Sequence, residues 1–203
     1  TSTTITPINT WTNLIITVES GVTNGTKFYF NGVQDATTGT HTVTANTANL
    51  NIGRRTTGGF EMDGKISNIA IWNSDQTTEK DNIYNSGVPA TSYTNTPTAW
   101  YKLDQSANWD VSSSGNWTIP DASGNGNDGT SSGMTSASLV LSDLTRAVPY
   151  DSYSFDLDGT DDQITTGQTL TSLGISTEFT VSFWFNSTNL GIYDTLLGSP
   201  NGN

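Results

Sequence analysis

Short runs in which apolar and polar residues alternate recur along the whole chain, and no other feature constrains the fold as strongly. The clearest runs are residues 11–19 (WTNLIITVE), 65–73 (KISNIAIWN) and 179–186 (FTVSFWFN). Side chains two residues apart lie on the same face of a strand, so each run has one face suited to a core. Gly, Asn, Asp and Ser, which are typical turn residues, separate the runs. The pattern predicts an all-β protein.

Local signals place one hairpin and one helix. Residues 27–31 lead into Asn31-Gly32, a dipeptide that favours a tight turn between two strands. A short helix is predicted at about 76–85, with Asp75 as its N-cap and Gly87 as its end. No other segment has a period of 3.6 residues, so at most one short helix is expected.

Composition narrows the range of partners. The chain has 203 residues, a net charge of −12 and a pI near 4.1, so we expect no nucleic-acid partner. Acidic oxygens do suit hard cations such as Ca²⁺. Only 33% of the residues are hydrophobic, but the six Trp favour a packed core over disorder. No apolar run approaches the roughly 18 to 20 residues of a membrane span, so no membrane insertion is expected.

Two groups of motifs together resemble the laminin-G-like, concanavalin A-like jelly-roll family. The closing half of such a domain is matched by the Trp11 strand, the hairpin at 27–32 (KFYFNG), residues 51–54 (NIGR) and residues 60–72 followed by the short helix. The opening half is matched by residues 100–104 (WYKLD), 121–129 (DASGNGNDG), 153–164 (YSFDLDGTDDQI) and the 179–185 strand. The resemblance implies a β-sandwich of two antiparallel sheets.

The two halves stand in reversed order, and this suggests two domain arrangements. In the first, residues 1–90 are the closing half of one jelly roll, 91–98 are a linker, and 99–203 are the opening half of a second jelly roll. The chain would then be a window cut through a tandem array. In the alternative, both halves form one permuted sandwich. We favour the first arrangement because a strand or two of the family's order is missing between the halves, which leaves edges to be covered by a neighbour.

The loop at 121–129 is the sharpest candidate for a metal site. Oxygen-bearing side chains at alternate positions can turn toward one centre, as a calcium ion with six to eight oxygen ligands requires. The candidate ligands are Asp121, Ser123, Asn125, Asn127 and Asp128. In the family that the chain resembles, calcium commonly lies at the sandwich rim, and Asp104 is a weaker candidate on the same ground. The alternative is a loop whose side chains bond their own backbone.

A second acidic cluster lies at residues 156–162 (DLDGTDD). Strand alternation puts Asp156 and Asp158 on one face, where like charges repel unless a cation or solvent separates them. We interpret this cluster as a hairpin with a solvated Asp-Gly turn, and keep a cation site as the alternative.

Trp109 and Trp117 are the candidate ligand-binding aromatics, because both lie in an irregular region rich in Ser, Asn and Gly. Exposed aromatic rings at such positions can stack on sugars. The alternative is that the two rings pin a long loop to the sandwich.

Catalysis is not expected. Glycosidases of the concanavalin A-like fold use two carboxylates about 5 Å apart, on a strand with the pattern E-x-D-x-x-E. Residues 61–66 (EMDGKI) match the first two places, but Ile66 stands where the last acid should be. The chain has one His and no Cys, which leaves little for a triad or a zinc site.

These observations predict a non-catalytic structural or adhesion module of a larger modular surface or virion protein. The composition, rich in Thr, Asn and Gly and free of Cys, suits a bacteriophage fibre or decoration component, with a secreted bacterial adhesin close behind. The alternative function is a calcium-dependent, carbohydrate-binding lectin domain. We expect an extracellular or virion-surface location, and neighbouring domains, copies of the same protein or cell-surface glycans as partners.

Overall fold

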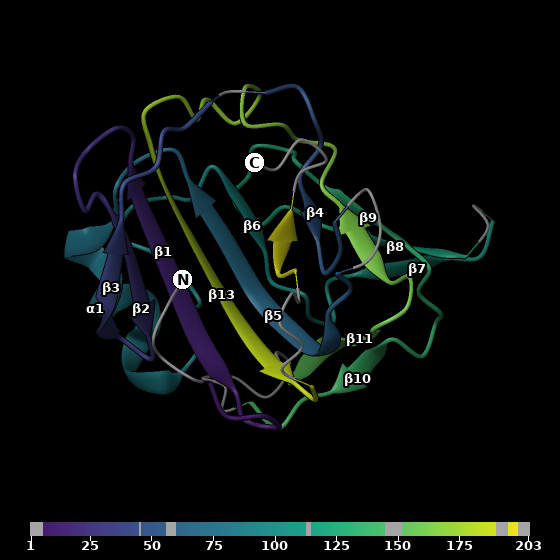
Figure 1. Ribbon diagram of the computed structural model, residues 1–203. Helices are drawn as coiled ribbons and strands as arrows, with labels where there is room; N and C mark the ends of the chain where they lie inside the picture. The colour runs from purple at the N-terminus through teal and green to yellow at the C-terminus, as the bar shows by residue number, and fades with distance from the viewer. Residues whose placement is uncertain are drawn as a thin grey trace.

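A computed structural model describes residues 6–44, 46–55, 60–112, 115–144, 152–189 and 195–198. Within these residues the strands form two antiparallel sheets (Figure 1). The eight-stranded sheet has the order β10 (Leu139–Leu141), β11 (Tyr153–Asp158), β5 (Asp63–Trp72), β13 (Glu178–Ser187), β1 (Thr12–Glu19), β2 (Thr26–Phe30) and β3 (Val33–Gly39), with β6 (Ala99–Tyr101) also paired to β5. The six-stranded sheet has the order β14 (Leu197–Gly198), β4 (Asn51–Ile52), β12 (Gln163–Thr165), β9 (Gly129–Ser132), β8 (Asn116–Ile119) and β7 (Asn108–Asp110). The prediction of an all-β, jelly-roll-like sandwich is confirmed.

The single short helix lies where the sequence predicts it. A 3₁₀ turn at Thr77–Glu79 continues into α1 (Lys80–Tyr84). The carboxylate of Asp75 accepts hydrogen bonds from the main-chain N–H and the hydroxyl of Thr77, so it caps the start of this segment. The helix ends at Asn85, which has φ +50° and is in the left-handed conformation. The sequence predicted this end two residues later, at Gly87.

Three long strands, β1, β13 and β5, lie side by side at the centre of the eight-stranded sheet (Figure 1). Their alternating residues divide between two apolar clusters. Leu14, Phe183 and Ile66 point toward the six-stranded sheet and pack in the main core between the sheets. That sheet contributes Ile52 and Ile164 to the same core, which is therefore closed from both sides.

The outer face of the eight-stranded sheet carries a second, smaller apolar cluster around Trp72 and Trp100. Tyr93 packs edge-on against both rings, at centroid distances of 5.0 Å in each case. The main-chain oxygen of Asn95 accepts the indole N–H of Trp72 at 2.8 Å. The segment 91–98, predicted as a linker or long loop, is thus a loop that packs against the sheet.

Each sheet contains strands from both halves of the chain. In the eight-stranded sheet, β13 lies between β1 and β5, with Leu14 opposite Phe183 and Ile71 opposite Val181. In the six-stranded sheet, β4 pairs with β12. Residues 1–90 and 99–203 therefore both contribute strands to each of the two sheets. The division of a longer protein into successive tandem domains stays a prediction.

Candidate functional site

The segment between β11 and β12 crosses from one sheet to the other. β11 pairs with β5 and β10 in the eight-stranded sheet, whereas β12 pairs with β4 and β9 in the six-stranded sheet. The interpretation of this segment as a hairpin is therefore wrong. The physical reason is that Leu157 and Ile164 bury their side chains in the same core from opposite sheets, which a shared two-strand ladder would not allow.

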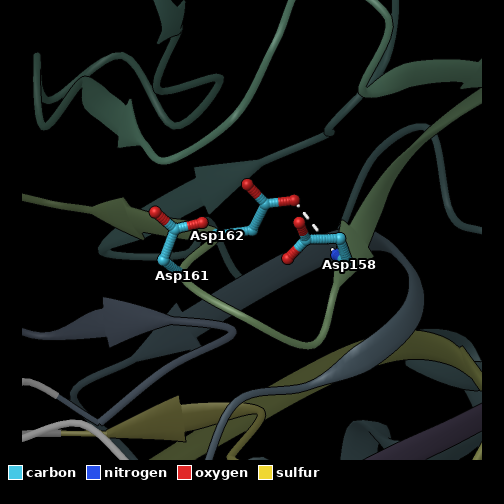
Figure 2. Close-up of side chains that lie close together, drawn as sticks. All are labelled: Asp158, Asp161 and Asp162. Atoms are coloured by element: carbon cyan, nitrogen blue, oxygen red, sulfur yellow. Dashed lines mark hydrogen bonds between the residues drawn. The ribbon is translucent and has the colours of Figure 1, made fainter.

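Three carboxylates meet at this crossing (Figure 2). One oxygen from each of Asp158, Asp161 and Asp162 lies within 4.8 Å of the others. Asp162 is only 5% exposed, while Asp158 and Asp161 face solvent. The Oδ2 atom of Asp162 accepts the main-chain N–H of Asp158 at 3.1 Å, and this bond closes the turn. The cluster thus has one enclosed carboxylate and two open ones.

Burial and neighbouring charge both disfavour ionisation of the enclosed carboxylate. Desolvation is the main cause that raises the pKa of Asp162 to about 6, and the charges of Asp158 and Asp161 add to it. Burial also raises the pKa of Asp156, although Lys65 opposes that shift. A cation among these carboxylates would relieve the repulsion.

A hollow of about 190 Å³ adjoins the cluster and is lined by Asp156, Asp158 and Asp162 together with Gly133 and Ser138. Gly133 has φ +82°, and a Cβ at this position would lie 2.5 Å from the main-chain oxygen of Asp161. Glycine is therefore required for the close approach of the end of β9 to the acidic turn. This packing holds Asp161 and Asp162 where the structure places them.

The side chains of the acidic cluster are chemically suited to bind calcium. Ca²⁺ takes oxygen ligands only, and three carboxylates supply at least three of the six to eight that it needs. The other ligands of such sites are main-chain oxygens and water, and the open side of the hollow leaves room for them. The residues present thus fit Ca²⁺ better than a metal that prefers His or Cys ligands.

In the loop at 121–129, the carboxylate of Asp121 accepts hydrogen bonds from other groups of the protein. Oδ1 of Asp121 accepts the main-chain N–H groups of Trp100 and Ser123 at 2.8 and 2.9 Å. Oδ2 accepts the Ser123 hydroxyl at 2.7 Å and the Asn127 N–H at 3.0 Å. Both oxygens already have two donors, so this carboxylate does not fit a metal ligand in this conformation.

The remaining candidates in that loop are also engaged. The side-chain amides of Asn125 and Asn127 both donate to the main-chain oxygen of Thr98, at 3.0 and 2.9 Å. Oδ1 of Asp128 accepts the N–H of Asp121 at 2.8 Å. The side chains of the loop thus bond main-chain groups both within the loop and at Thr98 and Trp100 outside it. The calcium assignment of the loop stays a prediction without geometric support.

Asp104 is buried and closes a local turn. Its Oδ1 atom accepts the main-chain N–H and the hydroxyl of Ser106, at 2.8 and 2.6 Å. The structure does not bring it into the cluster of Asp158, Asp161 and Asp162. A ligand role for Asp104 stays a prediction.

The two candidate aromatics of the β7–β8 hairpin lie at different depths. Trp117 is 6% exposed, donates its indole N–H to the main-chain oxygen of Thr135 and packs edge-on against Phe155 in the core. This enclosed ring cannot stack on a ligand, so Trp117 pins the loop to the sandwich, as the alternative interpretation states. Trp109 is half-buried and lies over Trp117 at a centroid distance of 5.4 Å. A binding role stays a prediction for Trp109 alone.

The incomplete glycosidase pattern occupies a structural position. Ile66 is fully buried in the core, so the place of the missing acid faces away from solvent. Glu61 forms an ion pair with Arg54 at 3.2 Å. The pattern therefore serves packing and surface charge pairing here.

Comparison with known families finds a match for the first part of the chain. Residues 1–81 match the family model described as the concanavalin A-like lectin/glucanases superfamily. The match covers 81 of the 203 residues, and this segment is similar to that superfamily. No curated protein and no solved structure matches the chain. Within the described residues, no helix is long and apolar enough to cross a membrane.

The concanavalin A-like segment supplies β1 to β5, and the acidic cluster lies outside it, on the strands that complete the sandwich. The superfamily indicates a carbohydrate-binding or structural module, and its laminin-G-like domains are typically non-catalytic and extracellular. Its members often bind Ca²⁺. Asp161 and Asp162 were missed as leading ligands because the sequence does not show that β11 and β12 belong to different sheets.

Proposed function

We propose that this chain is a non-catalytic structural and adhesion module of a larger surface or virion protein, and that its fold is tightened by calcium at the β11–β12 crossing. The observation that carries the proposal is the cluster of Asp158, Asp161 and Asp162 at the β11–β12 turn, where the chain passes from the eight-stranded to the six-stranded sheet. An ion at this turn would stabilise the fold, because it would link the end of β11 in one sheet to the start of β12 in the other.

The roles of the three carboxylates follow from their positions. Asp158 ends β11 and Asp162 immediately precedes β12, so ligation by both fixes the length and direction of the crossing. Asp161 lies on the exposed side and would be the third carboxylate ligand. A bound Ca²⁺ supplies charge neutralisation and oxygen coordination, which would stabilise Asp162 as a carboxylate despite its burial.

A module of this kind would work within a modular parent protein. The net charge of −12 and the absence of Cys suit a protein whose stability comes from β-sheet packing and hard cations rather than from disulfides. Neighbouring domains or other copies of the chain are the partners that we propose, at an extracellular or virion surface. A lectin activity is the second candidate, and a hollow of about 200 Å³ at the start of β1, lined in part by Trp11 and Tyr84, favours it.

Isothermal titration calorimetry of the metal-free protein with CaCl₂ tests the proposed site. We expect one ion per chain, and loss of that binding in the Asp162→Asn and Asp161→Asn variants. The matched control is Asp110→Asn, which changes a half-buried carboxylate at the end of β7 that accepts the main-chain N–H and the hydroxyl of Ser112. Equal calcium binding by wild type and Asp162→Asn would contradict the proposed site.

A further inference from the structure

The loop at 121–129, between β8 and β9, contains the dipeptide Asn125-Gly126. An Asn-Gly dipeptide can modify itself, because the main-chain nitrogen of the glycine can attack the carboxamide carbon of the asparagine. Glycine favours the attack because it has no Cβ to hinder it. Two more such dipeptides, Asn24-Gly25 and Asn31-Gly32, lie within the described residues. The folded surroundings of each dipeptide therefore decide which asparagine can react.

The dipeptide Asn24-Gly25 is held at both reacting groups. The N–H of Gly25 donates to the main-chain oxygen of Val22 at 2.9 Å. Oδ1 of Asn24 accepts the hydroxyl of Thr38, on β3, at 2.8 Å. Both bonds have to break before the carboxamide can reach the glycine nitrogen. The fold therefore protects Asn24.

The dipeptide Asn31-Gly32 is held by β1. The N–H of Asn31 donates to the main-chain oxygen of Asn13 at 2.9 Å, and Oδ1 of Asn31 accepts the N–H of Asn13 at 2.9 Å. Rotation of the carboxamide toward Gly32 would take the acceptor from Asn13, a fully buried residue. Gly32 itself lies against the ring of Tyr84, where an added Cβ would be 2.7 Å from Cδ1. The fold therefore protects Asn31 as well.

The dipeptide Asn125-Gly126 lacks these restraints. Both residues are exposed, and no atom lies within 4 Å of a Cβ added at Gly126. Among the residues that the structure describes, none accepts the N–H of Gly126. One hydrogen bond holds the carboxamide of Asn125, whose NH₂ group donates to the main-chain oxygen of Thr98 at 3.0 Å in an exposed place. Only this bond opposes the approach of the two reacting groups.

We propose that Asn125 is a site of spontaneous deamidation, so that the loop gains negative charge as the protein ages. The nitrogen of Gly126 loses its proton to a solvent base and bonds to Cγ of Asn125, the Cγ–Nδ2 bond breaks, and ammonia leaves. Water then opens the resulting succinimide at either carbonyl and gives aspartate or isoaspartate at position 125. Water is the only co-reactant, and nothing is oxidised or reduced.

The modification removes a donor from a shared acceptor. The main-chain oxygen of Thr98 accepts the side-chain amides of Asn125 and Asn127 and the hydroxyl of Ser123, at 3.0, 2.9 and 3.3 Å. A carboxylate at position 125 cannot donate, and its negative charge repels the carbonyl oxygen. Thr98 directly precedes β6, so deamidation weakens the attachment of the loop to the start of this strand.

Peptide mass spectrometry of the full chain, incubated in its folded state at about pH 8.5, tests the proposal. A high pH speeds the reaction because the glycine nitrogen must lose a proton. We expect the peptide with Asn125 to become about 1 Da heavier and to contain isoaspartate. Its rate should exceed the rates at Asn24 and Asn31 by at least about fivefold, because the bonds that hold those two asparagines must break first.

Unfolding in concentrated urea provides the matched control. All three asparagines precede glycine, so their intrinsic reactivity is the same and only the folded surroundings distinguish them. In urea the three rates should agree within about twofold. Asn125→Gln should abolish the gain in mass at position 125, because its longer side chain would have to close a larger, less favourable ring.

Hydrogen exchange measures the effect on the loop. The N–H of Ala122 donates to the main-chain oxygen of Trp100 at 2.7 Å, and the N–H of Asn127 donates to Oδ2 of Asp121 at 3.0 Å. Both N–H groups should exchange faster in the aged protein and in Asn125→Asp than in fresh wild type. The N–H of Ile15, in the central strand β1, should keep its protection.

Equal rates at the three asparagines of the folded chain, or faster modification at Asn24 or Asn31 than at Asn125, would overturn the proposal. Unchanged exchange at Ala122 and Asn127 in Asn125→Asp would refute the weakened attachment of the loop. These outcomes are separate from calcium binding, because the loop shares no residue with the acidic cluster of Asp158, Asp161 and Asp162.

Discussion

The main-chain N–H of Asp158, the last residue of β11, donates a 3.1 Å hydrogen bond to Oδ2 of Asp162, the residue immediately before β12. The two residues thereby close the turn that carries the chain from one sheet to the other. The same bond holds the Asp162 carboxylate in a partly enclosed place beside two other acids. Fold closure and charge crowding therefore depend on the same side chain, which explains why a cation would affect stability here.

Stability without calcium should depend on pH through Asp162. Its pKa is about 6 in the folded protein and 3.8 ordinarily, so between these values the folded state holds a proton that the unfolded state has lost. The free energy of unfolding should therefore fall as pH rises from about 4 to 6. Urea unfolding in EDTA at several pH values measures this, and in Asp162→Asn the fall should be smaller. Identical pH profiles for the two proteins would contradict the shift.

Gly133→Ala should disturb the acidic turn. Its new Cβ would meet the main-chain oxygen of Asp161 at 2.5 Å, so we expect both lower stability and weaker calcium binding. Gly124→Ala is the matched control, because Gly124 also has positive φ but has no atom within 4 Å of the added Cβ. The control should lose only about 1 to 2 kcal/mol from left-handed backbone strain. Thermal unfolding and calorimetry compare the two, and equal effects would show that the contact is unimportant.

Asp121→Ala should destabilise the fold without removing calcium binding. It takes the acceptors from the N–H groups of Trp100 and Asn127, and leaving a buried donor unpaired costs about 1 to 3 kcal/mol. Asp110→Ala removes a half-buried carboxylate whose bonds from Ser112 are open to solvent, and should cost less, about 0.5 to 1.5 kcal/mol. Urea unfolding gives both values. Loss of calcium binding in Asp121→Ala, with its fold intact, would return the metal site to the loop at 121–129.

The pairing of the two halves can be tested by a disulfide in a chain that has no Cys. Glu19 and Glu178 lie directly opposite each other on β1 and β13. Directly paired positions on antiparallel strands lie within the Cα separation that a disulfide spans. Glu19→Cys with Glu178→Cys should form an intramolecular disulfide, measured by mass spectrometry and gel mobility, whereas Glu19→Cys with Glu79→Cys should not. Predominantly intermolecular cross-links would contradict this pairing.

The sequence predicted the strands well because their signal is local. Alternation in 179–186 is sufficient to assign β13, and Asp75 marks the start of the helical segment by a bond within two residues. The association of the two halves was harder, because it depends on Leu14 meeting Phe183 across the sheet and no local pattern encodes that pairing.

The candidate site was predicted less well, for the same reason. Asp121 has the spacing of a metal ligand, but its oxygens accept from Trp100, which lies 21 residues earlier in the chain. Trp117 looks like a loop aromatic, yet the strand pairing of β8 turns its ring into the core. The sequence shows the acidic run at 156–162, but only the assignment of β11 and β12 to different sheets brings Asp158 and Asp162 together at a crossing.

Thermal unfolding of wild type and Asp162→Asn, each with excess CaCl₂ and with EDTA, tests the central claim most directly. A ligand that binds only the folded state adds about 2.7 kcal/mol of stability at a hundredfold excess over its dissociation constant. We predict a melting temperature that rises with Ca²⁺ and falls with EDTA in wild type, and that does not respond in Asp162→Asn. A wild-type melting temperature that is the same in Ca²⁺ and EDTA would contradict a calcium-tightened crossing between the sheets.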